Sequence, residues 1–218
     1  MDSVPDSVPE SSDRPRPTRA ADRLLSSAAR RGGVITRDQI DLEGHASRIV
    51  HDLVADGRLI RVGRGVYRLA EYAPFGEAAL VVACAIVPRG VVTLVSALAQ
   101  YKLTTQIPAS VFLAVPSRTN DLSGTPEVRI ALVRVAPRFL RTDVQAVTAD
   151  SGGRYRIFAK ERAVCEAFRF RRIVGEDVAY EALGNLLRGP FDRARLVRAA
   201  ALTGTGNFVL PPVKALLP

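Results

Sequence analysis

A short alternating segment in the first third of the chain constrains its fold more than any other feature. Apolar residues alternate with others on both sides of a turn rich in glycine and arginine, in the sequence RLIRVGRGVYRL from Arg58 to Leu69. This alternation predicts two short strands joined as a β-hairpin. The fold that the hairpin completes depends on the residues that precede it.

Two amphipathic helices are predicted before the hairpin. The first begins near Thr18 and ends at Gly32-Gly33, and the other runs from about Ala46 to Ala55 before Gly57. Apolar residues recur at helical spacing on one side of each helix. These residues are Ala21, Leu24, Leu25 and Ala28 in the first helix, and Ile49, Val50, Leu53 and Val54 in the other.

A short helix is predicted between these two, at roughly Arg37–Leu42. Thr36 precedes it as a good N-cap residue, and Gln39 stands three positions later, as a capping box requires. Helix, short helix, helix and hairpin within about 50 residues is the order of a winged helix-turn-helix domain. The three helices supply the core, and the hairpin covers its open side as the wing.

We therefore expect an α+β protein with a winged helix-turn-helix domain at residues 18–70 and a mixed α+β domain at residues 71–218. Residues 1–17 are rich in Pro, Ser and acidic residues and are expected to form a disordered tail. In the C-terminal part, β-branched runs predict strands, and helical periodicity predicts helices. The expected helices are 71–87, 93–103, 160–173, 177–187 and 192–203, and the expected strands are 111–115, 128–135 and 155–158.

The charge distribution points to a polyanionic partner. The chain carries 31 Lys and Arg against 22 Asp and Glu, a net charge of +9. Residues 1–13 contain four acids and no base, so the remainder carries +13. Such a body favours nucleic acid through phosphate neutralisation. Because 28 of the 31 basic residues are Arg, a GC-rich genome is an alternative cause.

Several function classes are disfavoured. We find no phosphate-binding loop, dinucleotide fingerprint, GxSxG or HExxH motif, so no enzyme, cofactor or metal is expected. His45 and His51 are spaced i, i+6, which does not place both on one helix face. Two cysteines, no secretion signal and no apolar run of membrane-spanning length indicate a cytoplasmic protein without a membrane role.

The predicted helix-turn-helix supplies candidate DNA contacts. Its second helix enters the major groove, where Arg48 is expected to read a guanine. Thr36 and Arg37 begin the supporting helix, where free N–H groups favour a phosphate. The expected DNA-binding residues are Thr36, Arg37, His45, Ser47, Arg48, His51, Arg61, Arg64 and Arg68. The alternative is a winged helix used for protein contacts.

A second basic cluster follows in the C-terminal part. Its members are Arg154, Arg156, Lys160, Arg162, Arg169, Arg171 and Arg172. It is interpreted either as a second patch, for DNA or an acidic partner, or as a solvated helix face. Glu161 and Glu166 within it are expected to form surface ion pairs.

The ordered series of motifs resembles the AbiEi-type antitoxin family. Gly57-Arg58-Leu59 and Arg64-Gly65-Val66-Tyr67 match the end of the family's N-terminal domain. The segments VVTLVSALAQYKLTTQIPASVFLAVP and IFAKERAVCEAFRFRRIVGEDVAYEAL are similar to later family segments. The resemblance covers about residues 20–200.

This resemblance implies a bacterial antitoxin that neutralises a nucleotidyltransferase-like toxin and represses its own operon. Its winged helix would bind inverted repeats in promoter DNA, which suits two protein copies because the symmetry of the protein matches that of the operator. Neutralisation without a stable complex, as in type IV systems, and direct contact with the toxin both stay open. Two other classes also remain: a winged-helix regulator with a ligand-sensing or dimerising C-terminal domain, and an enzyme with a DNA-targeting module.

Overall fold

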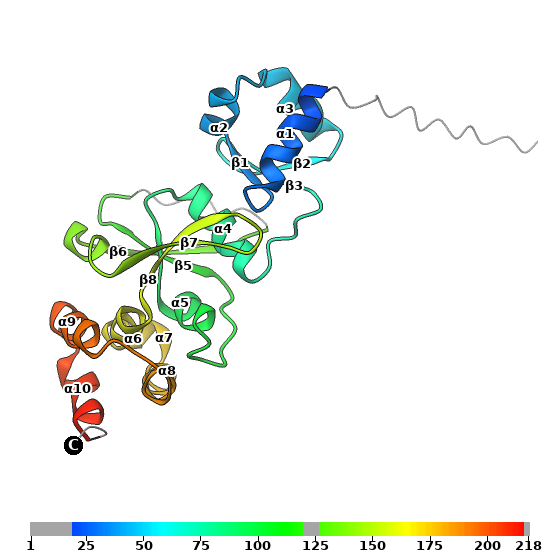
Figure 1. Ribbon diagram of the computed structural model, residues 1–218. Coiled ribbons are helices and arrows are strands. Elements are labelled where there is room, and N and C mark those ends of the chain that lie inside the picture. The colour runs from blue at the N-terminus through cyan, green and yellow to red at the C-terminus, as the bar shows by residue number, and fades with distance from the viewer. Residues whose placement is uncertain (1–18, 120–126, 216–218) are drawn as a thin grey trace, which may run out of the picture.

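The computed structural model describes residues 19–119 and 127–215. The predicted tail at residues 1–17 lies outside these ranges. Figure 1 shows an N-terminal unit at one end, a β-sheet in the middle and a group of helices at the other end. No helix in the described ranges is long and apolar enough to cross a lipid bilayer.

The N-terminal unit, residues 19–69, contains the predicted helices and hairpin. Its elements are α1 (Arg19–Ala29), β1 (Val34–Thr36), α2 (Arg37–Leu42), α3 (Ser47–Ala55), β2 (Leu59–Gly63) and β3 (Val66–Leu69). The capping box at α2 is confirmed: Gln39 donates its N–H to the Thr36 hydroxyl, and Thr36 donates its N–H to the Gln39 side chain. The strand β1 was not expected, and it joins an antiparallel sheet in the order β1-β3-β2.

A small apolar core holds the N-terminal unit together. Leu24 of α1, Ile40 of α2 and Leu53 of α3 are buried beneath the hairpin strands. Tyr67 packs against the same cluster, as expected for an aromatic residue under the wing. The three-helix core covered by a hairpin is therefore the winged helix-turn-helix arrangement that the sequence predicts.

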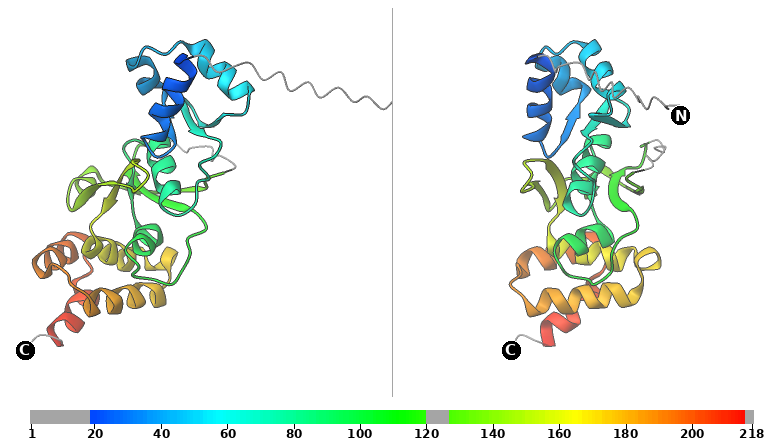
Figure 2. Two further views of the ribbon diagram at one scale, coloured as in Figure 1. Left: turned by 45° about the vertical axis from the view of Figure 1, so that its right-hand side comes forward. Right: turned by 90° about the vertical axis from the view of Figure 1, so that its right-hand side faces the viewer.

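The C-terminal unit, residues 77–215, is a mixed sheet with helices gathered mainly at one end (Figure 2). Its strands are β4 (Val91–Val92), β5 (Val111–Pro116), β6 (Ile130–Val135), β7 (Val144–Thr148) and β8 (Arg154–Phe158). Its helices are α4 (Glu77–Ile86), α5 (Leu94–Gln100), the 3-10 helix η1 (Pro137–Leu140), α6 (Lys160–Arg169), α7 (Arg171–Val174), α8 (Glu176–Arg188), α9 (Arg193–Thr203) and α10 (Gly206–Ala215). The predicted α+β class is confirmed.

The sheet order is β6-β5-β4-β8-β7. β4 pairs parallel with β8 and antiparallel with β5, so this two-residue strand joins two halves of the sheet. Neither β4 nor β7 was expected from the sequence. The helix predicted at 160–173 is divided at Phe170, and α10 was missed because Pro211 and Pro212 lie within it.

Close backbone contacts join the two units. A Cβ atom at Gly152, in the turn between β7 and β8, would lie 2.4 Å from the Arg30 carbonyl oxygen. A Cβ atom at Gly153, in the same turn, would lie 3.2 Å from the Arg31 carbonyl oxygen. In addition, Val34 and Val66 of the N-terminal unit belong to the large core cluster of the C-terminal unit. The boundary at residue 70 therefore crosses a continuous apolar core.

Candidate nucleic-acid interface

Arg37 lies where the wing turn and the starts of α2 and α3 meet. Its backbone N–H donates to the Gly65 carbonyl oxygen at 2.7 Å. Its guanidinium donates to the Ser47 hydroxyl at 2.7 Å and to the Asp41 carboxylate at 3.1 Å. Two predicted DNA contacts, Arg37 and Ser47, are thus held together at the beginning of the candidate recognition helix.

The outer face of α3 carries the most exposed of the predicted contacts. The Arg48 side chain is 91% exposed and lies 4.0 Å from Asp52, one turn later on the helix. The His51 side chain is also largely exposed. The N-cap residue Ala46 makes no side-chain hydrogen bond, so the first N–H groups of α3 are open to an external acceptor. An exposed guanidinium beside such a helix start suits contact with a base edge or a phosphate.

The wing adds two more exposed arginines. Arg64 lies in the turn between β2 and β3, and Arg61 lies on β2 with its Nε donating to the Gly63 carbonyl oxygen at 3.3 Å. The positive φ of Gly65 allows this tight turn, in which the Arg37 N–H is bound. The arginines of the wing and those around α3 are therefore presented by a single small scaffold.

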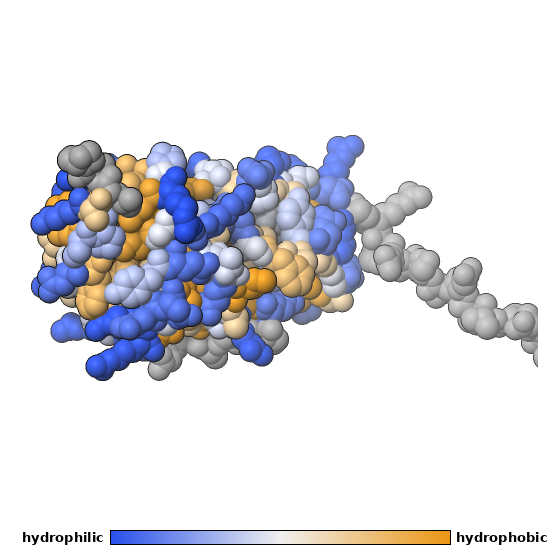
Figure 3. Space-filling model, turned by 90° about the horizontal axis from the view of Figure 1, so that it is seen from below, coloured by the Kyte–Doolittle hydropathy of each residue, from blue (hydrophilic) through white to orange (hydrophobic). Residues whose placement is uncertain are grey.

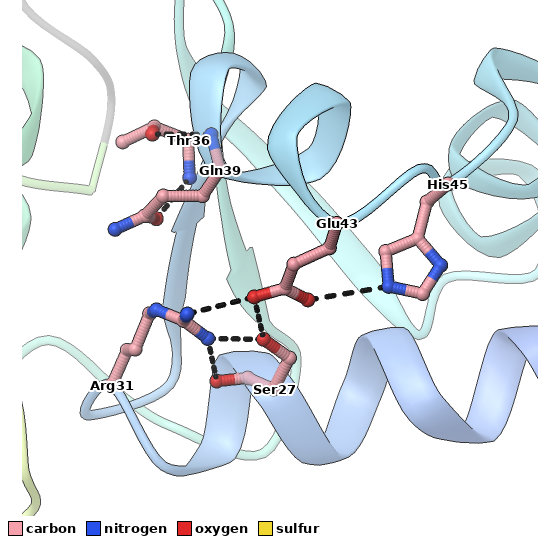
Figure 4. Close-up of polar contacts among 6 residues, drawn as sticks. All are labelled: Ser27, Arg31, Thr36, Gln39, Glu43 and His45. Carbon is pink, nitrogen blue, oxygen red and sulfur yellow. Dashed lines mark hydrogen bonds and ion pairs between the residues drawn. The ribbon is translucent and has the colours of Figure 1, made fainter.

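A polar network fixes the turn between α2 and α3 (Figure 4). The Glu43 carboxylate accepts hydrogen bonds from the Ser27 hydroxyl at 2.7 Å and from the Arg31 guanidinium at 2.7 Å. Arg31 also donates to Ser27. The Ser27 hydroxyl, with the nearby Arg31 charge, lowers the pKa of Glu43. The carboxylate therefore stays ionised and holds the turn against α1.

Two of the predicted DNA-binding residues, His45 and Thr36, make hydrogen bonds or ion pairs within the N-terminal unit. His45 has a side chain only 8% exposed, and its Nε2 lies 3.3 Å from the Glu43 carboxylate, so the residue supports the turn and does not face outwards. The Thr36 hydroxyl is engaged in the capping box of α2. The His45 side chain is therefore not placed for the DNA contact that the sequence suggested, and the Thr36 N–H and hydroxyl are both engaged in the capping box.

Arg68 is the clearest correction among the predicted contacts. It is 7% exposed, and its guanidinium donates to the Glu127 carboxylate at 2.6 Å and 2.9 Å. It also donates to the carbonyl oxygens of Leu69, Ala70 and Tyr72. With its donors engaged in this way, Arg68 joins the wing strand to the C-terminal unit, and we exclude it from the candidate interface.

The second basic cluster is divided in space. Arg154 lies near the junction of the two units, whereas Arg171 lies at the helical end and pairs with Glu176 of α8 at 3.0 Å. Arg162 is fully buried, forms an ion pair with Glu166 and lies over the rings of Phe139 and Phe158. The seven residues therefore do not lie together in one place.

The acidic residues of α6 are buried rather than exposed. Glu166 pairs with Arg162 inside the protein, and Glu161 accepts the Asp192 N–H at 2.9 Å while lying 3.6 Å from Arg195. The expected surface ion pairs are thus wrong. Ala163 and Phe168 of the same helix are also fully buried.

The helical end of the molecule has a mixed surface. Viewed from this end, it shows blue hydrophilic side chains between orange apolar areas (Figure 3). Ile173 on α7, Tyr180 on α8 and Val197 on α9 are exposed apolar residues in this part of the chain. Arg172 is exposed beside Ile173, so charge and apolar surface alternate here.

Within the described ranges, no group of three or more His, Cys, Asp and Glu side chains is placed to hold a metal ion. Burial raises the pKa of Cys84 to about 11 and that of Cys165 to about 12. Both thiols are therefore protonated at neutral pH and poor nucleophiles.

The sequence did not single out Arg31, Glu43 or Glu127 as structural residues. Arg31 and Glu43 are 12 positions apart, and Arg68 and Glu127 are 59 apart. Helical spacing indicates only partners three or four residues apart, so no local pattern identifies these pairs.

Comparison with known proteins supports this assignment of the N-terminal unit. The family model described as "Transcriptional regulator, AbiEi antitoxin" matches residues 22–70. No curated protein sequence matches the chain. The crystal structure of the RV2827C protein from Mycobacterium tuberculosis is similar, with a TM-score of 0.52 and 18% identity over 85% of this chain and 72% of that chain. At this identity the similarity shows the fold alone. Residues 22–70 therefore match an AbiEi antitoxin-type transcriptional regulator domain, and the resemblance found in the sequence is confirmed over that range.

Proposed function

We propose that this protein is the antitoxin and autorepressor of a bacterial toxin–antitoxin operon and acts in the cytoplasm. The observation that carries the DNA-binding part is the arrangement around Arg37. This residue joins the wing turn and the start of α3, and exposed arginines flank it on both elements. Its domain matches a family of transcriptional regulators.

The proposed DNA contact has two components. Arg48, with His51 one turn later, reads bases in the major groove, whereas Arg61 and Arg64 on the wing bind the phosphate backbone. Arg37 holds Ser47 at the start of α3 and contributes positive charge beside the backbone. The operator is proposed to be an inverted repeat in the protein's own promoter, bound by two copies of the chain.

The proposed toxin is a nucleotidyltransferase-like protein encoded next to this gene. The support is the antitoxin description of the family that matches residues 22–70. The C-terminal unit is proposed to neutralise the toxin, directly or indirectly. The mixed surface at Ile173, Tyr180 and Val197 is a suitable place for direct contact, because exposed apolar groups are common in protein interfaces.

Co-expression tests the antitoxin function. The neighbouring toxin gene is expressed from an inducible promoter with and without the full-length chain, and colony counts are compared. We expect rescue by the wild type and by Arg48→Ala, whose substitution lies on the DNA-facing side. If the full-length chain never restores growth, it is not the antitoxin of that toxin.

DNA binding is tested separately with fragments of the upstream region. Wild type should bind one fragment in preference to shuffled DNA, and repression of a reporter from that fragment should require Arg48. Equal binding of both DNAs by wild type and Arg48→Ala would contradict the role of a sequence-specific repressor.

A cavity favours a second candidate function, a regulator that responds to a ligand. The cavity has a volume of about 610 Å³ and is lined mostly by apolar residues of α4, α5 and residues 104–111. Glu127, the partner of Arg68, also lines it. A ligand bound there would contact the ion pair that joins the wing to the C-terminal unit. Failure of co-expression rescue together with retained operator binding would favour this candidate.

A further inference from the structure

A recess between the two units gathers polar side chains, three of them basic, from three segments. Its volume is about 380 Å³, and Val34 and Val81 contribute apolar surface to it. The polar side chains that line it belong to the turn after α1, to α2 and to the start of β8. They are Arg30, Arg31, Gln39 and Arg154. Three guanidinium groups thus line one small recess.

The acidic groups nearby neutralise only one of these three charges. Arg31 is paired with Glu43, but Arg30 and Arg154 form no ion pair within the described parts of the chain. The exposed Asp150 of the adjoining turn has no ion pair with either of them. Bringing like charges together is unfavourable without a counter-ion, so the recess favours an anion.

An amide donor complements the arginines. The Gln39 side-chain oxygen accepts the Thr36 N–H at 2.9 Å, which fixes the side chain and leaves its NH₂ group available (Figure 4). Guanidinium and amide groups together match the acceptor oxygens of a phosphate.

The backbone around the recess is held in place before any ligand binds. Gly152, which lines the recess, lies so close to the Arg30 carbonyl that a Cβ atom would be 2.4 Å from its oxygen. A Cβ atom at Gly32 would be 2.8 Å from the Ser151 hydroxyl. These contacts fix the spacing of Arg30 and Arg154, and preorganised donors bind with less loss of entropy.

We propose that this recess binds the phosphoryl group of a free phosphorylated small molecule and that the bound group links the two units. Duplex DNA offers the same phosphate chemistry. A recess walled by both units suits a terminal phosphate better than the continuous backbone of a duplex. Because Arg30 and Gln39 lie on the N-terminal unit and Arg154 on the C-terminal unit, the ligand strengthens the junction that positions the DNA-binding domain.

The test is calorimetric titration of the full-length protein with inorganic phosphate, pyrophosphate and ATP. The variants are Arg30→Gln and Arg154→Gln. The matched control is Arg198→Gln, an exposed arginine on α9. We expect saturable binding of at least one phosphate compound, weakened about tenfold by either variant and unchanged in the control. The thermal midpoint of unfolding should rise with the ligand in wild type and in the control, and less in the two recess variants.

A second arm distinguishes the sources of phosphate. A 30-base-pair duplex of the upstream region is titrated into the same proteins. If Arg154→Gln weakens duplex binding while no free phosphate compound binds wild type, the recess serves DNA and the proposal is wrong. Binding that is weak, unsaturated and equal in all variants would also overturn it. The co-expression and operator tests do not depend on Arg30 or Arg154, so the two proposals fail separately.

Discussion

Single arginines in this protein perform different tasks that their sequence positions do not reveal. Arg48 and Arg64 are exposed at the candidate interface, Arg68 is buried in a contact between the units, and Arg162 is buried in the C-terminal core. Composition treats them all as positive charge. Burial separates those that can meet DNA from those that stabilise the fold.

The first prediction compares two of the exposed arginines. Arg48→Ala should reduce discrimination between operator and shuffled DNA, because a bidentate base contact contributes about 1–3 kcal/mol. Arg64→Ala should weaken binding to both DNAs and reduce the salt slope by about one, because it removes a phosphate contact. Fluorescence anisotropy at several salt concentrations measures both effects. Identical salt slopes and preferences in all three proteins would refute the assigned roles.

The second prediction concerns the contact between the wing strand and the C-terminal unit. Glu127→Gln should lower the free energy of unfolding by about 2 kcal/mol, because it leaves the Arg68 guanidinium without its charged partner. Urea denaturation measures the loss. Glu71→Gln is the control, since Glu71 is exposed and forms no ion pair in the described ranges. An equal change in the free energy of unfolding of the control would show that the Arg68–Glu127 pair does not stabilise the protein more than an ordinary surface residue does.

At the scale of elements, sequence patterns predict those helices and strands that depend on residues close together in the chain. The Thr36–Gln39 capping box, α1, α3 and the hairpin all depend on residues a few positions apart, and each was expected near its observed place. The strands β1, β4 and β7 were missed. The first two are too short to show alternation, and they pair with strands distant in the sequence. β7 instead forms a local hairpin with β8, which was not expected from the sequence.

The same limit explains why the acidic side chains of α6 were expected at the surface although they are buried. Helical spacing relates Arg162 to Glu166, and the pair does form. Its burial depends on Phe139 and Phe158, which come from other elements. Spacing predicts partners along a helix, whereas tertiary packing decides whether they meet inside or outside the protein.

The third prediction concerns the network that fixes the α2–α3 turn. The pKa of Glu43 is lowered in the folded protein, so its stabilising effect is present above the ordinary value of 4.5 and is lost as the pH falls through the lowered value. Thermal unfolding from pH 7 to pH 3 should therefore show a smaller acid destabilisation for Glu43→Gln than for wild type. Parallel pH profiles for the two proteins would contradict this role.

On the scale of the whole molecule, the two units are not independent. α4 contacts all three strands of the N-terminal sheet, and the turn between β7 and β8 abuts the end of α1. A fragment beginning at Ala70 would expose the side of α4 that Val34 and Val66 cover. Point variants in the full chain are therefore the better way to separate DNA binding from neutralisation.

The fourth prediction tests the junction. Gly152→Ala should lower the free energy of unfolding by about 2 kcal/mol or more, because the new Cβ would collide with the Arg30 carbonyl. Gly204→Ala is the matched control: it also has a positive φ, but no atom lies within 4 Å of its new Cβ. The difference between the two variants isolates the junction from backbone strain. Equal losses in urea denaturation would mean that the contact can relax.

The tight junction at Gly152 and the Arg68–Glu127 pair have a geometric consequence for operator choice. A DNA-binding domain on a flexible tether accepts half-sites at many separations. Here the domain is braced against the rest of its own chain, so two copies that touch through their C-terminal units would hold their recognition helices at a set distance and rotation. The protein would then select operators by the separation of their half-sites. Inserting about five base pairs between the half-sites turns one half-site to the opposite side of the duplex, so the two copies should no longer bind together. Inserting a full helical turn restores the rotation but increases the distance, so paired binding should also be lost.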